Sequence, residues 1–211
     1  MSATITRGWH AALAVLIAVA VVWQAVLVAR ADASLVNLFS YFTIQSNLLM
    51  MVASAGVAID PARHGRLFGA VRLAGLVGIT ITGVVYATVL AGQVEMTGAA
   101  KALDTIFHYI VPAASVIGFV LIQPRTQFDR SAGWFLAWPI AWLGYTLVRA
   151  VAVSPTYQVS DTGTGTARVP YDFLDFDAHG AGFVAIAAVL VTAVACLLAV
   201  GYLRIGGVRR S

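Results

Sequence analysis

The chain has 211 residues, of which 60% are hydrophobic and 10% are charged, and its formal net charge is +4. Soluble domains carry roughly a quarter charged residues, so this composition excludes an ordinary soluble domain. The basic excess does not indicate a nucleic-acid partner, because no basic cluster with interleaved aromatic residues accompanies it.

Six apolar stretches are each long enough to cross about 30 Å of hydrocarbon, a distance that takes about 20 helical residues. Lipid cannot satisfy open backbone groups, so each stretch is predicted to be a helix. Because the six stretches use most of the chain, we expect one all-α domain over residues 1–211, a polytopic bundle of six transmembrane helices. The predicted spans cover residues 9–29, 37–59, 67–92, 105–122, 133–153 and 180–203.

The arginines are unevenly distributed between the two sides that this topology defines. Positive residues collect on the cytoplasmic side of membrane proteins. The rule predicts an integral membrane protein with both termini and the 60–66 and 123–132 connections in the cytoplasm. The arginines on that side are Arg7, Arg63, Arg66, Arg125, Arg130, Arg204, Arg209 and Arg210.

The second span contains a cluster of hydrogen-bonding side chains in an otherwise apolar segment, Phe39-Ser40-Tyr41-Phe42-Thr43-Ile44-Gln45-Ser46-Asn47. Polar groups inside a bilayer are costly unless they find partners, so such a cluster is a functional-site hypothesis. At helical spacings of three and four residues, Ser40, Thr43 and Asn47 share one face.

The fourth span contains His108; the other histidine within a predicted span, His10, stands at the cytoplasmic start of the first span. The second and fourth spans both enter from the outside, and at 1.5 Å per residue Thr43 and His108 are both predicted roughly 5–10 Å below the outer interface. An alcohol attacks an ester when a base takes its proton, and histidine is the common base. The matched depth therefore favours Thr43 as a nucleophile and His108 as its base.

Several neighbours could support this pair. Asp104 stands one helical turn before His108, so its carboxylate could orient the imidazole ring. Donors to a developing oxyanion could come from Ser46, Asn47, Tyr86 or Tyr109, among which the sequence does not choose. No metal ion and no cofactor are expected.

Each of these residues also has a non-catalytic interpretation. A helical threonine usually donates its hydroxyl to the carbonyl four residues earlier, here that of Phe39. Asp104 could cap the start of the fourth span. Serine and asparagine side chains commonly link membrane helices. Under these interpretations the protein is a small carrier or a scaffold whose polar cluster only ties helices together.

The longest connection, residues 154–179, precedes the last span. Its first part contains a Gly-Thr tract over 161–166, which favours mobility. In its second part, Val169-Pro170-Tyr171-Asp172-Phe173-Leu174-Asp175, aromatic and acidic residues alternate. We expect this part to cover the outer mouth of the bundle.

Two of these motifs carry a family resemblance. The segment Tyr41-Phe42-Thr43-Ile44-Gln45-Ser46-Asn47, followed by His108 and Val111-Pro112, resembles the bacterial branch of the androgen-induced-protein family of membrane threonine hydrolases. The segment 169–175 is similar to the stretch before that family's last helix. The resemblance implies hydrolysis of membrane lipid esters, fatty acid esters of hydroxy fatty acids, with Thr43 as nucleophile and His108 as base. It also implies a bacterial plasma membrane.

Overall fold

The described part of the chain is almost entirely helical. A computed structural model describes residues 2–91, 96–122, 128, 130–158 and 166–207. Within these residues, six helices are long and apolar enough to cross a membrane, as the sequence predicts. They comprise Ala3–Arg30, Phe42–Ile59, Arg66–Leu90, Gly98–Ile122, Ser131–Ala152 and Phe176–Gly206.

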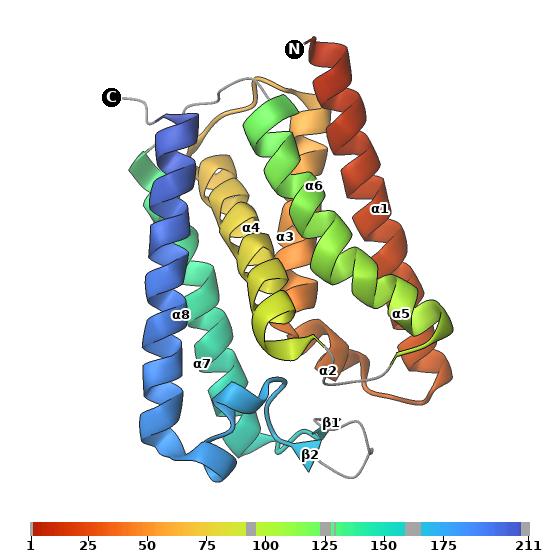
Figure 1. Cartoon of the computed structure of the whole chain (residues 1–211), viewed down its shortest axis with the longest axis vertical. Coiled ribbons are helices and arrows are strands. Elements are labelled where there is room, and N and C mark those ends of the chain that lie inside the picture. The colour runs from red at the N-terminus through yellow and green to blue at the C-terminus, as the bar shows by residue number, and fades with distance from the viewer. Residues whose placement is uncertain (1, 92–95, 123–127, 129, 159–165, 208–211) are drawn as a thin grey trace.

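Several of these long helices are composites of shorter elements (Figure 1). The α-helices are α1 (Ala3–Arg30), α2 (Leu35–Ser40), α3 (Phe42–Ile59), α4 (Arg66–Val85), α5 (Gly98–Thr105), α6 (Val111–Ile117), α7 (Ala137–Ala152) and α8 (Phe176–Gly206). Turns of π-helix cover Tyr86–Leu90, Ile106–Ile110 and Gly118–Ile122, and 3-10 turns cover Arg130–Leu136 and Asp172–Leu174. One short antiparallel ladder joins β1 (Tyr157–Gln158) to β2 (Thr166–Ala167).

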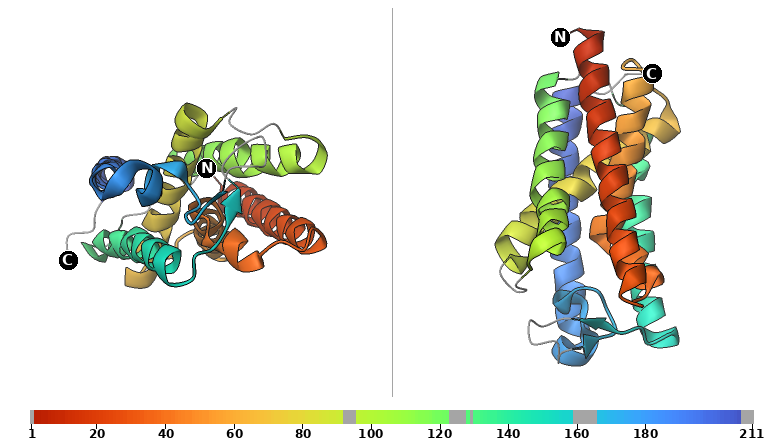
Figure 2. Two further views of the ribbon diagram at one scale, coloured as in Figure 1. Left: turned by 90° about the horizontal axis from the view of Figure 1, so that it is seen from below. Right: turned by 90° about the vertical axis from the view of Figure 1, so that its right-hand side faces the viewer.

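The long helices lie side by side, with α3 and α4 between α1 and α6 on one side and α7 and α8 on the other (Figures 1 and 2). Helix α1 begins and α8 ends at one end of the molecule, whereas α2, β1 and β2 lie at the opposite end, here called the distal end. Fully buried side chains from α1 and α4, among them Ile17, Leu73 and Ile79, form the apolar core.

Glycines allow α3 and α4 to approach closely. A Cβ atom added at Gly75 would lie 3.2 Å from the backbone of Leu49 and Met50. A side chain there would therefore push the two helices apart. About two turns further along α4, the hydroxyls of Thr82 and Ser46 are 2.9 Å apart and link the same two helices.

The predicted second span is not one continuous helix. It is broken at Tyr41, whose extended backbone (φ −66°, ψ 134°) ends α2 and begins α3. Breaking a helix frees backbone groups, which must find partners away from water. Side chains supply them: Trp142 Nε1 donates to the Ser40 carbonyl at 2.9 Å, and Gln45 Nε2 donates to the Phe39 carbonyl at 3.0 Å. The break places Thr43 in the first turn of α3.

The fourth long helix begins earlier than predicted, at Gly98 instead of 105. Asp104 consequently lies in the last turn of α5, and the N-cap position belongs to Thr97. The predicted capping role of Asp104 is therefore wrong. The turn of π-helix that follows contains His108 and ends just before Pro112, which has no N–H to continue the regular hydrogen-bond ladder.

The connection between α7 and α8 folds over the distal end. Residues 161–165 of the predicted mobile tract lie outside the described residues, and Thr166 belongs to β2. Ala167, Val169 and Leu174 are buried and pack with Trp142 of α7 and Val184 of α8. This apolar cluster holds the segment 166–175 against the helices.

Candidate active site

Thr43 and His108 meet at the distal end of the molecule. Thr43 Oγ1 lies 3.3 Å from His108 Nε2, a hydrogen-bond distance between side chains 65 residues apart in the sequence. The helix break explains why the Thr43 hydroxyl is free to contact His108. Phe39 and Thr43 do not belong to one continuous helix, and the Phe39 carbonyl accepts a hydrogen bond from Gln45 instead. By contrast, five other described threonines donate to the carbonyl four residues earlier, namely Thr6, Thr80, Thr88, Thr105 and Thr192.

The second nitrogen of His108 faces oxygen atoms of Asp104. Nδ1 is 3.0 Å from the Asp104 carbonyl, toward which its N–H is aligned, and 2.8 Å from the carboxylate Oδ1, which approaches off that axis. Both neighbours accept hydrogen bonds, so we assign the ring proton to Nδ1. Nε2 then presents its lone pair to the Thr43 hydroxyl, the arrangement that a general base requires.

Tyr86 fixes the orientation of both members of the His108–Asp104 pair. Its ring is stacked on the imidazole, with 3.9 Å between ring centroids and 15° between planes. Its hydroxyl donates to Asp104 Oδ2 at 2.5 Å. The sequence suggested Tyr86 as an oxyanion donor, whereas the structure directs its hydroxyl to the carboxylate and away from Thr43.

The other three candidate oxyanion donors do not face the Thr43 hydroxyl either. Ser46 Oγ and Asn47 Nδ2 donate to the Thr43 carbonyl at 3.0 and 2.8 Å, so they brace the backbone of α3. Tyr109 packs edge-on against Tyr86 and is 45% exposed. These residues support the scaffold around the site.

Tyr171, which the sequence did not select as a site residue, reaches Thr43 from the segment between β2 and α8. Its phenol oxygen accepts from the Thr43 backbone N–H at 3.2 Å and lies 3.3 Å from Thr43 Oγ1. The alternation of aromatic and acidic residues around it indicated only a covering segment. A contact across 128 residues leaves no local signal in the sequence.

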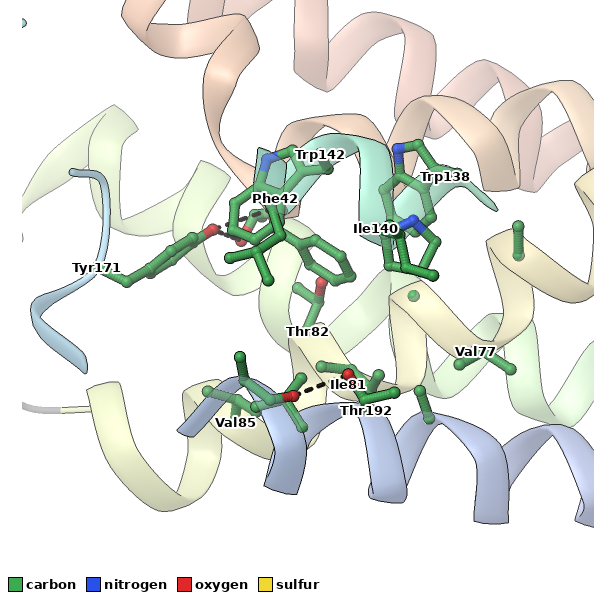
Figure 3. Close-up of a pocket in the computed structure, with 18 of the residues that line it drawn as sticks. Phe42, Val77, Ile81, Thr82, Val85, Trp138, Ile140, Trp142, Tyr171 and Thr192 are labelled. Carbon is green, nitrogen blue, oxygen red and sulfur yellow. Dashed lines mark hydrogen bonds between the residues drawn. The ribbon is translucent and has the colours of Figure 1, made fainter. Parts of the chain in front are cut away.

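The polar residues stand at one end of an apolar cavity with about 980 Å³ of empty space, a volume that includes open solvent at its mouth. Figure 3 shows Tyr171 at one end, Phe42, Trp138 and Trp142 along one side, and Ile81, Val85 and Thr192 along the opposite side. Thr43 and His108 contribute to its wall. A mostly apolar pocket with a few convergent polar groups is typical of a small-molecule site.

The cavity extends from the Thr43 end toward the middle of α4. Val85 lines it near His108 and Ala74 lines it at the far end, a distance of about 16 Å at 1.5 Å per residue. Ile140 of α7 and Thr192 of α8 line the cavity and are also exposed. The cavity therefore opens sideways between α7 and α8.

Comparisons of the chain with protein-family models, with curated proteins and with solved structures find no match. The functional interpretation therefore depends on the residues and geometry of the site, with the sequence resemblance as an expectation beside them.

Replacing Asp104 with asparagine is expected to lower kcat by about 10- to 100-fold and to leave KM nearly unchanged. In a reaction in which His108 accepts a proton, the Asp104 carboxylate would stabilise the resulting imidazolium, and asparagine carries no charge to do so. The backbone carbonyl of residue 104 still accepts the Nδ1 proton, so the ring keeps its tautomer and the loss stays moderate. Steady-state kinetics measures this effect.

Asp60→Asn is the matched control, because Asp60 caps a turn at the end of α3 far from His108. It is expected to retain the wild-type kcat. An Asp104→Asn variant with wild-type kcat would show that the carboxylate takes no part in the reaction.

Proposed function

We propose that the protein is an integral membrane protein with six transmembrane helices and both termini in the cytoplasm. Six long apolar helices support this proposal. Among the described arginines, Arg7, Arg63, Arg66 and Arg204 lie on or beside the helix ends opposite the distal end, whereas Arg30 and Arg168 lie at the distal end. Positive residues favour the cytoplasmic side. The distal end, with Thr43 and His108, then faces outward. A bacterial plasma membrane is the location that the family resemblance implies.

Within that membrane, we propose hydrolysis of lipid esters with Thr43 as nucleophile and His108 as general base. The observation that carries this proposal is the 3.3 Å contact of Thr43 Oγ1 with His108 Nε2 at the end of the apolar cavity. A threonine that served only the helix would bond to its own backbone. The resemblance to the membrane threonine hydrolases adds the substrate type, a fatty acid ester of a hydroxy fatty acid.

The reaction follows from the arrangement of donors and acceptors. As Thr43 Oγ1 attacks the ester carbonyl carbon, its proton moves to His108 Nε2. The resulting imidazolium, beside the Asp104 carboxylate, returns the proton to the leaving alkoxide. Water then attacks the acyl-threonine, again with His108 as base. The His108 side chain retains 16% exposure, so water can reach it.

The shape of the cavity suits a substrate that arrives from the lipid phase. Its side opening between α7 and α8 would admit an acyl chain laterally, and its apolar wall would accept that chain without a desolvation cost. A length of about 16 Å along α4 accommodates a long acyl chain. The ester carbonyl then lies at the polar end, beside Thr43.

Purified protein in detergent micelles or nanodiscs tests the function. We expect hydrolysis of long-chain esters and covalent labelling by an alkyl fluorophosphonate, a reagent for activated hydroxyl nucleophiles. A folded, monodisperse preparation that cleaves no ester of any chain length and takes no label would overturn the proposal.

Replacing Val77 with phenylalanine is expected to shift the preference toward shorter acyl chains. Val77 is 3% exposed and lines the far part of the cavity, so a larger ring would shorten the space for the chain. A hydrophobic pocket discriminates by about tenfold or more per displaced methylene group. We therefore expect kcat/KM for a palmitate ester to fall at least about tenfold relative to a butyrate ester.

Val84→Phe is the matched control. Val84 lies on the same helix but is 50% exposed and does not line the cavity. It should leave the ratio of the two kcat/KM values unchanged. Equal ratios in Val77→Phe and wild-type protein would argue against this cavity as the acyl-chain site.

A further inference from the structure

The segment between β2 and α8 places a phenol hydroxyl beside the Thr43 nucleophile. The Tyr171 oxygen accepts from the Thr43 N–H at 3.2 Å and lies 3.3 Å from Thr43 Oγ1. The Thr43 hydroxyl has one proton, which points to His108 Nε2 in the reactive arrangement. The Tyr171 O–H is therefore the donor to Thr43 Oγ1, and a chain of donors runs from Tyr171 through Thr43 to His108.

Aromatic packing holds this phenol in place. The Tyr171 ring is stacked on Phe173, with 5.5 Å between centroids, and meets Tyr41 edge-on at 5.9 Å. The ring centroid of Trp142 in α7 lies 6.1 Å from that of Tyr171. Burial among these rings raises the pKa of the Tyr171 phenol, so the group stays protonated and able to donate. A donor held in a water-poor site is already oriented before the reaction.

The N-terminus of α3 adds a second donor on the same side. Tyr41 precedes the first turn of α3 and provides no side-chain cap, so the first backbone N–H groups of this helix need an external acceptor. In the resting site the Tyr171 oxygen is the acceptor for the Thr43 N–H. The phenol O–H and this N–H thus converge on the space next to Thr43 Oγ1.

We propose that Tyr171, together with the Thr43 N–H, forms the oxyanion hole of the site, an inference that rests on the proposed hydrolase function. When the Thr43 oxygen bonds to the ester carbon, the π-electron pair of the carbonyl moves to its oxygen. The Tyr171 O–H turns from Thr43 Oγ1 to that oxygen and donates to it without losing its proton. Collapse of the intermediate returns the electron pair, breaks the bond to the leaving oxygen, and sends the His108 proton to that oxygen.

The test is Tyr171→Phe, which keeps the ring packing and removes the hydroxyl. Removing one oxyanion donor lowers kcat by about 10²- to 10³-fold, and we expect this loss with KM nearly unchanged. Binding of a long-chain trifluoromethyl ketone, whose adduct with Thr43 carries an oxyanion, should weaken by about 100-fold. Binding of hexadecane, which has no oxygen to accept a hydrogen bond, should stay at the wild-type value.

Tyr41→Phe is the matched control, because Tyr41 packs against the same ring and its hydroxyl contacts neither Thr43 nor His108. It should keep the wild-type kcat. If Tyr171→Phe keeps the wild-type kcat and ketone affinity, Tyr171 is not the oxyanion donor, although the hydrolase function stands. If ketone and hexadecane affinities fall together, the hydroxyl serves packing only. Wild-type protein without any activity would instead overturn the proposed function.

Discussion

Replacing Thr43 with alanine is expected to remove ester hydrolysis and fluorophosphonate labelling, with a loss of at least about 10³-fold in kcat. No other described hydroxyl pairs with His108 Nε2, so a substitute nucleophile is missing from the site. The Thr43 side chain makes no hydrogen bond within its own helix, and its carbonyl keeps the bonds from Ser46 and Asn47. The melting temperature should therefore change little. Activity, labelling and thermal unfolding are measured on the same preparation.

Thr43→Ser and Thr88→Ala provide the controls. Serine restores a hydroxyl at the same position, so Thr43→Ser should recover a measurable part of the activity and take the label. Thr88 donates to its own helix, at the Val84 carbonyl, and its replacement should leave kcat unchanged. The opposite pattern, full activity in Thr43→Ala with a lowered melting temperature, would favour the scaffold interpretation.

Replacing His108 with alanine is expected to lower kcat by about 10³-fold, within the range that general-base catalysis contributes. The change leaves a ring-shaped space between the Tyr86 ring and Thr43. Free imidazole fits this space and can take the Thr43 proton. Added imidazole should therefore restore part of the activity, with a concentration dependence that saturates. The rate of ester cleavage at increasing imidazole concentrations is the measurement.

Two controls separate this rescue from unspecific catalysis. Imidazole should not restore Thr43→Ala, because the nucleophile itself is missing there. His64→Ala should retain wild-type activity, since His64 is exposed between α3 and α4 and contacts the Ala62 carbonyl. Wild-type kcat in His108→Ala would exclude this histidine as the base.

The architecture was largely predictable because hydrophobic length is a property of the sequence itself. Each of the six predicted spans corresponds to a long helix. Helix boundaries were less predictable. The second span breaks at Tyr41, and the position of this break depends on residues far away in the sequence. Trp142, for example, donates to the Ser40 carbonyl that the break exposes.

The site was predictable only in part. Thr43 and His108 were selected by their polarity and matched depth, and the structure brings them together. The interpretation of Asp104 as a helix cap is wrong because α5 extends the helix back to Gly98. The predicted fourth span began only at residue 105, since the residues before it include the polar Lys101 and Asp104. The sequence did not indicate Tyr171 because its contact with Thr43 depends on how residues 166–175 fold back over the helices, and the local sequence pattern does not reveal that fold.

The most direct test of the account is mass spectrometry of the protein quenched during turnover of a long-chain ester. The account predicts an acyl group esterified to the Thr43 hydroxyl, which accumulates further when deacylation is slowed, and no such adduct in Thr43→Ala. An acyl group on a different residue of an active enzyme, or turnover in which no acyl-protein can be trapped while Thr43→Ala remains active, would contradict it.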